Sequence, residues 1–200
     1  NIYKFVLVGT QMGGSIAAWF ASQHTERISA LIIMSAGALG ENRTNMLLYK
    51  LMATRILGKA IVRTLPFWFF AERWRSAYVN KSVATDEVVK TYHNRFKETG
   101  DTQTRIGLQI RASYGRDFKR FERPMKTLDI PTLLIWGKED SLVPISTAYR
   151  FLELIQASDL MLIPGCGDFP HEEYPSVVSD SIKEFIADQP AQGLTHLTES

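Results

Sequence analysis

The sequence predicts an α/β protein built on a mostly parallel sheet flanked by helices. Four short apolar runs, at residues 3–8, 30–34, 131–136 and 160–163, have the length and composition of strands. The runs are continuously apolar rather than alternating, which is typical of strands in a parallel sheet that helices cover on both faces. Helical segments separate these runs, and the alternation of strand and helix indicates the α/β class.

The elements follow in strand-to-helix order. The first run leads through a glycine-rich turn into an apolar-rich helical segment at residues 15–22. Residues 145–155, between the third and fourth strands, carry apolar side chains at the spacing of an amphipathic helix. Residues 174–187 repeat that spacing after the fourth strand. The sequence therefore predicts a helix after each of these three strands.

A long helical insertion interrupts this order. Residues 41–126 have mostly helical patterns and include a cluster of aromatic side chains. We therefore expect a core of residues 1–40 and 127–188, a helical insertion of residues 41–126, and a polar tail of residues 189–200 that frays. His24 and His93, which lie beside the first helix and within the insertion, are expected at the surface.

Composition excludes several classes of function. The chain has 200 residues, 45% of them hydrophobic, and a formal net charge of +2, so no overall charge excess indicates nucleic acid or an anionic membrane surface. No apolar run approaches the roughly 20 residues that span a bilayer, and no signal peptide is visible. The single cysteine, Cys166, excludes a disulfide within the chain and favours a cytoplasmic location and a small buried thiol. The histidine spacing indicates no metal site, and nothing indicates a cofactor.

The turn after the first strand carries the functional signal. It reads Gly9-Thr10-Gln11-Met12-Gly13-Gly14, and its small residues allow the chain to turn sharply from strand to helix. This segment resembles the nucleophile elbow of the α/β-hydrolase fold family, G-x-S-x-G in the same context. The resemblance places Gln11 at the position of the nucleophile and implies that Met12 would donate the backbone N–H of the oxyanion hole.

Two later segments continue the resemblance. The strand run that ends at Gly137 is followed by Asp140 and Pro144, which is similar to the family segment that holds the triad acid, here Asp140. The loop Gly165-Cys166-Gly167-Asp168 resembles the loop in which family members carry the triad histidine, so Asp168 occupies the histidine position. His171 lies three residues further on and is expected to cap or pack near the following helix. The resemblance thus implies a degenerate catalytic triad.

The two substitutions predict a loss of ester hydrolysis. An amide has no proton that a base could remove from its oxygen, so Gln11 cannot act as a nucleophile. A carboxylate at position 168 could accept a proton, but repulsion from Asp140 would keep one of the two acids protonated.

The insertion matches in position the helical cap that the family places over its active site. By that resemblance its aromatic side chains, with His171, would line a pocket for a small apolar molecule; the alternative is that they form the core of the insertion. The candidate side chains are Phe67, Trp68, Phe70 and Trp74.

The resemblance covers only the C-terminal half of a family domain, from the elbow strand onward. The N-terminal strands of the family are missing, which leaves the first strand as an apolar edge. We therefore expect a fragment, a truncated reading frame, or a module whose sheet is completed by a partner or a missing N-terminal segment.

Three functions remain open at this point. The first is a hydrolase by ancestry that binds a small apolar molecule without hydrolysing it. The second is a non-hydrolytic enzyme, an isomerase, lyase or cyclase, that uses Asp168 or Asp140 as general acid or base. The third is an interaction module that pairs its half-sheet with another polypeptide.

Overall fold

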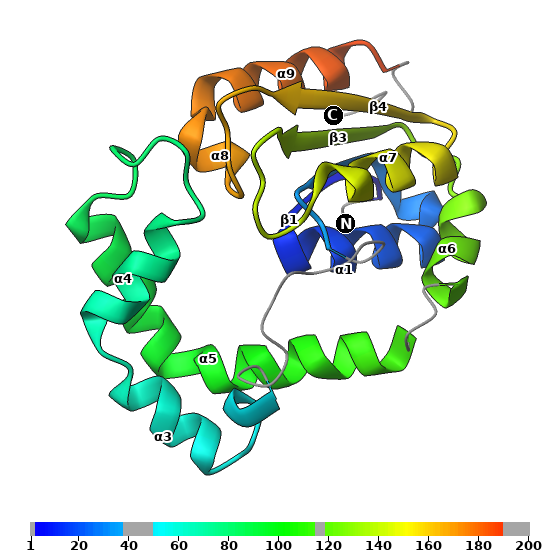
Figure 1. Ribbon diagram of the computed structural model, residues 1–200. Helices are drawn as coiled ribbons and strands as arrows, with labels where there is room; N and C mark the ends of the chain where they lie inside the picture. Colours follow the sequence, from blue (N-terminus) through cyan, green and yellow to red (C-terminus); the bar gives the residue numbers. More distant parts are fainter. Residues whose placement is uncertain (1–2, 38–49, 115–118, 190–200) are drawn as a thin grey trace, which may run out of the picture.

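A computed structural model describes residues 3–37, 50–114 and 119–189 of the chain (Figure 1). Part of the expected insertion, residues 41–49, and nearly all of the expected tail, residues 190–200, lie outside the described residues.

The centre of the fold is a four-stranded sheet in the order β1-β2-β3-β4. All neighbouring pairs are parallel, which confirms the predicted class. The strand boundaries differ by one or two residues from those of the predicted apolar runs. The reason is that the hydrogen bonds between the strands also include polar residues that flank the runs. They are β1 (Phe5–Thr10), β2 (Ile28–Met34), β3 (Thr132–Gly137) and β4 (Ser158–Ile163).

The parallel register brings the carboxyl ends of the strands to one edge of the sheet. Thr10 at the end of β1 lies opposite Met34 at the end of β2. Met34 in turn lies opposite Ile135, and Gly137 at the end of β3 lies opposite Ile163 at the end of β4. The loops that follow all four strands therefore meet at this edge, which is where open α/β sheets bind their ligands.

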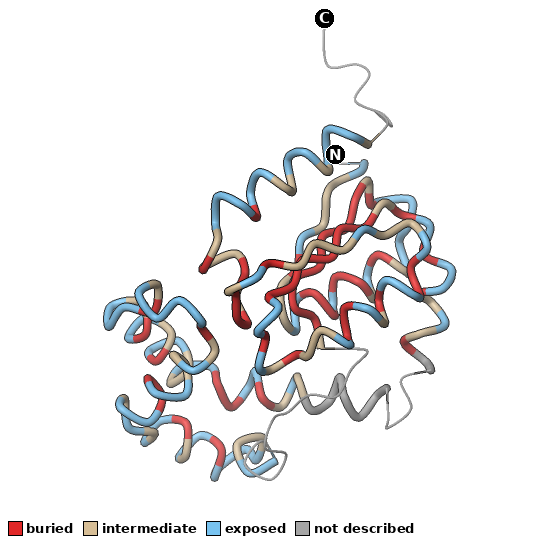
Figure 2. The backbone as a smooth tube through the Cα atoms, turned by 45° about the horizontal axis from the view of Figure 1, so that its top comes forward, coloured by how far each residue is buried: buried red, intermediate tan, exposed pale blue. Residues whose placement is uncertain are grey.

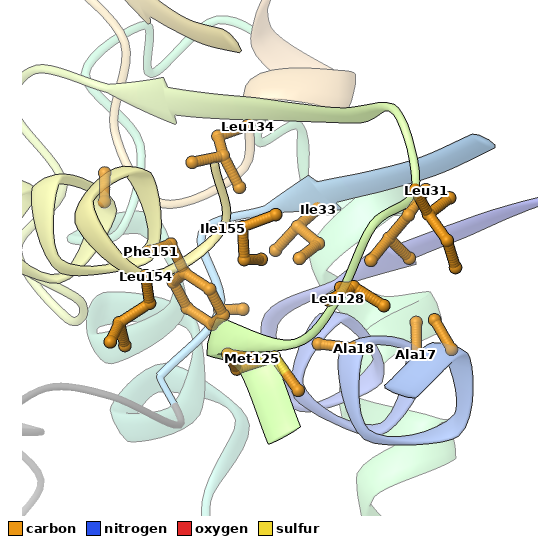
Figure 3. Packing of buried hydrophobic residues seen from close by; sticks show 14 of the residues in the cluster. Ala17, Ala18, Leu31, Ile33, Met125, Leu128, Leu134, Phe151, Leu154 and Ile155 are labelled. Carbon is orange, nitrogen blue, oxygen red and sulfur yellow. The ribbon is translucent and has the colours of Figure 1, made fainter. Parts of the chain in front are cut away.

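One face of the sheet is covered by three helices, α1 (Gln11–Gln23), α6 (Lys119–Lys126) and α7 (Ile145–Leu154). Figure 3 shows Leu31 and Ile33 of β2 and Leu134 of β3 among the side chains of this layer. The opposite face packs against α9 (Pro175–Ala187), through residues that alternate with these along each strand. The continuously apolar strands are explained by this cover on both faces. Two short elements, η1 (Thr25–Arg27) and α8 (Pro170–Glu173), complete the core.

Prolines mark the beginnings of several helices. Pro170 and Pro175 occupy the first positions of α8 and α9, where a missing N–H costs no helical hydrogen bond. Pro144 directly precedes α7. The chain can therefore leave β3 and β4 and enter the next helix within a few residues.

The helical insertion lies between β2 and β3 in the chain and beside the sheet in space (Figures 1 and 2). Its main elements are α3 (Leu57–Thr64), α4 (Phe67–Arg75) and α5 (Asp86–Tyr114), and both α3 and α4 pack against α5. Their own core is an aromatic cluster around Phe70 and Tyr78. The expected surface position of His93 is wrong: its ring is buried between Phe67 and Phe70, and Nε2 lies 3.1 Å from the carbonyl oxygen of Leu65.

Within the described residues, no helix is long and apolar enough to cross a membrane.

The core beneath the sheet should dominate stability. Phe151 is fully buried, with its ring 6.2 Å from Trp136 and 6.3 Å from Phe121, whereas its neighbour Leu152 is 37% exposed. We expect Phe151→Ala to lower the free energy of unfolding by about 3–5 kcal/mol, because it removes buried contacts and leaves a cavity. Leu152→Ala, the matched control, should cost less than about 1 kcal/mol. Urea unfolding followed by circular dichroism measures both, and equal losses would contradict the packing described.

Candidate active site

The turn from β1 into α1 has the geometry of a nucleophile elbow. Gln11 has φ 52°, a left-handed conformation that side chains rarely adopt. A Cβ at Gly9 would lie 2.5 Å from the carbonyl oxygen of Gly13, and a Cβ at Gly14 would lie 2.9 Å from the Cβ of Ala36. The close approach of these backbones therefore requires glycine and holds residue 11 at the carboxyl edge of the sheet.

Gln11 uses its amide to bridge two loops. Its Nε2 donates a hydrogen bond of 2.7 Å to the backbone carbonyl oxygen of Asp168, which follows β4. The two positions that depart from the family pattern are thus in direct contact. Met12 follows in the first turn of α1, where backbone N–H groups have no partner within the helix.

The carboxylate of Asp168 is directed toward the loop after β3. Its Oδ1 accepts hydrogen bonds from the backbone N–H of Ser141 at 2.7 Å and of Leu142 at 3.3 Å, and the Ser141 hydroxyl lies 3.3 Å from the same oxygen. Asp168 is only 2% exposed. Its backbone, and not its carboxylate, is therefore the part that meets Gln11.

Asp140, in the loop after β3, lies against the carboxylate of Asp168. Its Oδ1 accepts hydrogen bonds from the N–H groups of Leu142 at 3.0 Å and Val143 at 2.6 Å. Burial raises the pKa of Asp140 to about 7; the neighbouring carboxylate of Asp168 adds to the rise, and the bond from Val143 opposes it. Its Oδ2 is buried and receives no hydrogen bond. A proton held between the two carboxyl groups would remove both the repulsion and the unpaired oxygen.

Ser35 also lies at this edge, although it was not among the residues predicted for the site. Ser35 directly follows β2, is fully buried and has φ 48°, so it is a second left-handed residue at the carboxyl ends of the strands. Its side chain lies near enough to Asp140 to lower the pKa of that carboxyl against the larger effect of burial. The only signal in the sequence was its place directly after a strand run.

Two glutamates that were not predicted for the site, Glu172 and Glu173, form a clamp that holds the Asp168 loop to the insertion. Glu172 accepts hydrogen bonds from the hydroxyls of Tyr78, at 2.6 Å, and of Tyr92. Glu173 accepts from the backbone N–H groups of residues 79 and 80 through Oε2, and from Gly167 through Oε1 at 2.7 Å. Burial and the Glu172 acceptor raise the pKa of both tyrosines, so their hydroxyls remain donors. This clamp joins α5 and the segment that follows α4 to α8 and to the loop that carries Asp168.

The predicted aromatic side chains separate into two groups. Phe70 and Trp74 belong to the packed cluster of the insertion, and Trp74 stacks on Phe169, next to Asp168, with ring centroids 5.4 Å apart. Phe67 and Trp68 line an open hollow of about 640 Å³ on the insertion. The remaining residues that line it also belong to the insertion: Ala71, Glu72, Arg75, Ser76 and Lys81. Trp74 therefore contacts the loop that carries Asp168.

His171 and Cys166 flank the site without joining it. His171 lies in α8 with its ring edge toward Phe169, and burial lowers its pKa. It makes no hydrogen bond to Gln11 or Asp168, and its Nδ1 is buried without a partner. Cys166 is confirmed as a fully buried thiol, and burial raises its pKa to about 12. Among the residues with described side chains, no group of three His, Cys, Asp or Glu is placed to hold a metal ion.

Sequence comparison finds relatives that are longer than this chain. A hydrolase of Metapseudomonas resinovorans, named 2-hydroxy-6-oxo-6-(2'-aminophenyl)hexa-2,4-dienoic acid hydrolase, is 29% identical over 188 residues, which cover 92% of this chain and 60% of the relative. The human monoacylglycerol lipase ABHD6 is 25% identical over 94% of this chain and 56% of its own length. The chain thus spans about 60% of the length of these curated relatives.

Solved structures show the same fold. A meta-cleavage product hydrolase from Pseudomonas fluorescens matches with a TM-score of 0.68 and 22% identity over 94% of this chain and 66% of its own. A putative lipase from Acinetobacter baumannii matches with a TM-score of 0.73 and 20% identity, over 92% of this chain and 60% of its own. The model of the alpha/beta hydrolase fold family matches residues 1–175. With its parallel sheet and its elbow, the chain belongs to the α/β-hydrolase fold family.

Proposed function

We propose that this member of the hydrolase family has a degenerate catalytic triad, and that it binds a small apolar molecule without hydrolysing esters. The observation that carries the proposal is the hydrogen bond of 2.7 Å from the Gln11 amide to the backbone of Asp168. It joins the nucleophile position and the histidine position through groups that cannot perform the serine–histidine reaction.

The chemistry at both positions supports this proposal. The amide nitrogen of Gln11 has a delocalised lone pair, and its oxygen has no proton to lose, so it forms no acyl intermediate. The Asp168 carboxylate is bound by the N–H groups of residues 141 and 142, and Gln11 contacts the backbone of Asp168. The triad requires a base that takes a proton from the nucleophile, and this arrangement supplies none at position 11.

The two replacements also compensate each other sterically. Aspartate is shorter than histidine and reaches only as far as the Asp140 loop, where it takes the N–H donors of Ser141 and Leu142. Glutamine is longer than serine and extends from the elbow to the backbone of Asp168. Together the two side chains occupy the path along which a triad would pass its proton. This favours the view that the two substitutions compensate each other and did not arise independently.

Helices α3 to α5 are proposed to act as the cap of this site. The ring of Trp74 stacks on Phe169, one residue from Asp168, so the aromatic cluster of the insertion reaches the edge of the sheet. The Glu172 and Glu173 clamp holds that arrangement in place. A relative is named as hydrolase of an aminophenyl-substituted hexadienoic acid, and an aromatic ligand of that size suits a site beside stacked rings.

Acid–base catalysis is a second candidate, favoured by one observation. Burial and Asp168 raise the pKa of Asp140 to about 7, and a general acid or base is most effective when its pKa is near the working pH. Isomerase, lyase or cyclase chemistry would need only such a proton donor or acceptor. The low exposure of the pair, 8% for Asp140 and 2% for Asp168, favours the first candidate.

The first prediction concerns ester hydrolysis. The unmodified chain should hydrolyse short and medium acyl p-nitrophenyl esters no faster than Gln11→Ala, because neither protein has a nucleophile at position 11. In serine hydrolases, loss of the nucleophile lowers kcat by about 10⁶-fold. The measurement is stopped-flow release of p-nitrophenol at matched concentrations of folded protein.

The double variant Gln11→Ser, Asp168→His is the comparison that restores both triad positions. Turnover by this variant, and not by Gln11→Ser alone, would show that histidine at position 168 completes the reaction. A stoichiometric burst from the unmodified chain would contradict the proposal and would require a different nucleophile.

Ligand binding can be measured separately from hydrolysis. An unhydrolysed ester such as p-nitrophenyl butyrate should quench tryptophan fluorescence, and Trp74→Leu should raise its Kd by about 10-fold through loss of ring contact. Trp68→Leu, whose ring is 68% exposed, serves as the matched control and should leave Kd within about 2-fold. Equal weakening by both variants would contradict a site beside Trp74.

The raised pKa of Asp140 also predicts how stability depends on pH. Between the ordinary value of 3.8 and about 7, the folded chain holds a proton that the unfolded chain has lost. Raising the pH through that window should therefore lower the free energy of unfolding, by about 1–3 kcal/mol. Asp140→Asn keeps the acceptor oxygen and should abolish this part of the pH dependence.

Urea unfolding at pH 4.5, 6 and 8 tests this expectation. Asp159→Asn, at an exposed residue of β4, is the matched control and should keep the pH profile of the unmodified chain. A profile that is the same in Asp140→Asn and the unmodified chain would show that Asp140 is ionised throughout this range.

A further inference from the structure

The helical insertion exposes large apolar side chains on α3, on α4 and just before α3. Ile56 is 85% exposed, Trp68 68%, Leu57 48% and Phe69 37%. The rings of Trp68 and Phe69 meet edge to face, with centroids 5.8 Å apart. Single exposed apolar residues are ordinary on a protein surface, but several on consecutive helices indicate a contact with something less polar than water.

The same segment has a large surplus of positive charge. Residues 50–81 include seven Lys or Arg and one acidic residue, Glu72, a surplus of six positive charges. The remainder of the chain has 16 basic and 20 acidic residues, a surplus of four negative charges. The small net charge of +2 therefore conceals a strongly basic segment in a chain that is otherwise acidic.

Most of these cations are available to a partner. Arg55, Lys59, Arg63 and Arg73 are exposed and form no ion pair with any residue in the described part of the chain. Arg75 differs, because it pairs with Asp86. The free cations alternate with the exposed apolar residues along the chain, so charge and apolar surface occur together.

The exposed sides of helices α3 and α4 lie opposite the sides that they bury. Helix α3 buries Gly58 and Val62, and helix α4 buries Phe70 and Ala71, while both helices pack on α5. Their exposed sides therefore face away from α5, at the outer margin of the molecule (Figures 1 and 2). The open hollow lined by Phe67 and Trp68 lies on this part of the insertion.

We propose that this outer surface docks on an anionic lipid bilayer, lying in the headgroup layer without spanning it. We call it the docking surface, and it consists of two sets of side chains: the apolar Ile56, Leu57, Trp68 and Phe69, and the basic Arg55, Lys59, Arg63 and Arg73. Aromatic and aliphatic side chains enter the boundary between headgroups and acyl chains, while Lys and Arg bind lipid phosphate and carboxylate groups. The proposal goes beyond the proposed function and does not depend on it.

Charge complementarity favours lipid over the other occupants of such a surface. A second copy meeting the first through this surface would bring two positive surpluses together, which opposes association. A nucleic acid would neutralise the cations but would leave Ile56 and Leu57 without an apolar environment. An anionic bilayer supplies both negative charge and an apolar layer.

Vesicle binding by the whole chain tests the proposal. Vesicles of phosphatidylcholine with about 30 mol% phosphatidylserine should bind the chain at least 10-fold more tightly than phosphatidylcholine alone, and about 0.5 M salt should remove the difference. Binding is read by co-sedimentation. The blue shift of tryptophan fluorescence should accompany it, and Trp68→Phe should remove most of that shift.

Paired variants separate this surface from other exposed apolar residues. Trp68→Ser with Phe69→Ser should reduce vesicle binding at least 10-fold, and so should Lys59→Glu with Arg63→Glu. The control is Val177→Ser with Ile186→Ser, an exposed apolar pair on α9, whose substitution should leave binding unchanged. Circular dichroism confirms that each variant is folded.

Three results would overturn the proposal. The first is equal binding to vesicles with and without phosphatidylserine, or none to either. The second is unchanged binding by both pairs of variants on the docking surface. The third is that these variants abolish self-association or binding to duplex DNA while vesicle binding is absent, which would assign the surface to a second copy or to nucleic acid. None of these readouts involves ester hydrolysis, so failure here is distinguishable from failure of the proposed function.

Discussion

The alignment of four parallel strands is the constraint on which the candidate site depends. Because β1 to β4 end in register, the residues that follow them, Gln11, Ser35, Asp140 and the Asp168 loop, converge at one edge of the sheet. The apolar cover on both faces holds this register, since a shift along any strand would move its buried side chains out of their layer. The close contacts of Gly9 and Gly14 then force the sharp turn that places Gln11 there.

At that edge, hydrogen bonds join the loops that follow β1, β3 and β4. Gln11 is bound to the backbone of Asp168, and the Asp168 carboxylate is bound to the loop that contains Asp140. The clamp of Glu172 and Glu173 extends this structure into the insertion, because it ties residues 78–80 and Tyr92 to the segment directly after Asp168. A ligand held between insertion and sheet would therefore meet a rigid site.

One segment of the insertion combines exposed apolar side chains with positive charge. The sheet and its helices have two buried apolar layers, whereas residues 50–81 of the insertion expose large apolar side chains and have a surplus of six positive charges. The insertion therefore has two sides with different chemistry: stacked rings toward Asp168 and an exposed basic, apolar surface away from it.

The sequence by itself determined the α/β class, the parallel sheet, the elbow and the positions of Gln11, Asp140 and Asp168, because these depend on local composition and on glycines at fixed spacing. Only the tertiary structure decided what those residues contact. No local pattern shows that the Asp168 carboxylate is directed toward Ser141, that Ser35 lies beside Asp140, or that Glu172 meets Tyr78 from 94 residues away. His93 illustrates the same limit. Its charged neighbours along the helix suggested an exposed side chain, but its ring packs against Phe67 and Phe70. Contacts between residues far apart in the chain are set by how the elements pack, and packing is a property of the whole fold.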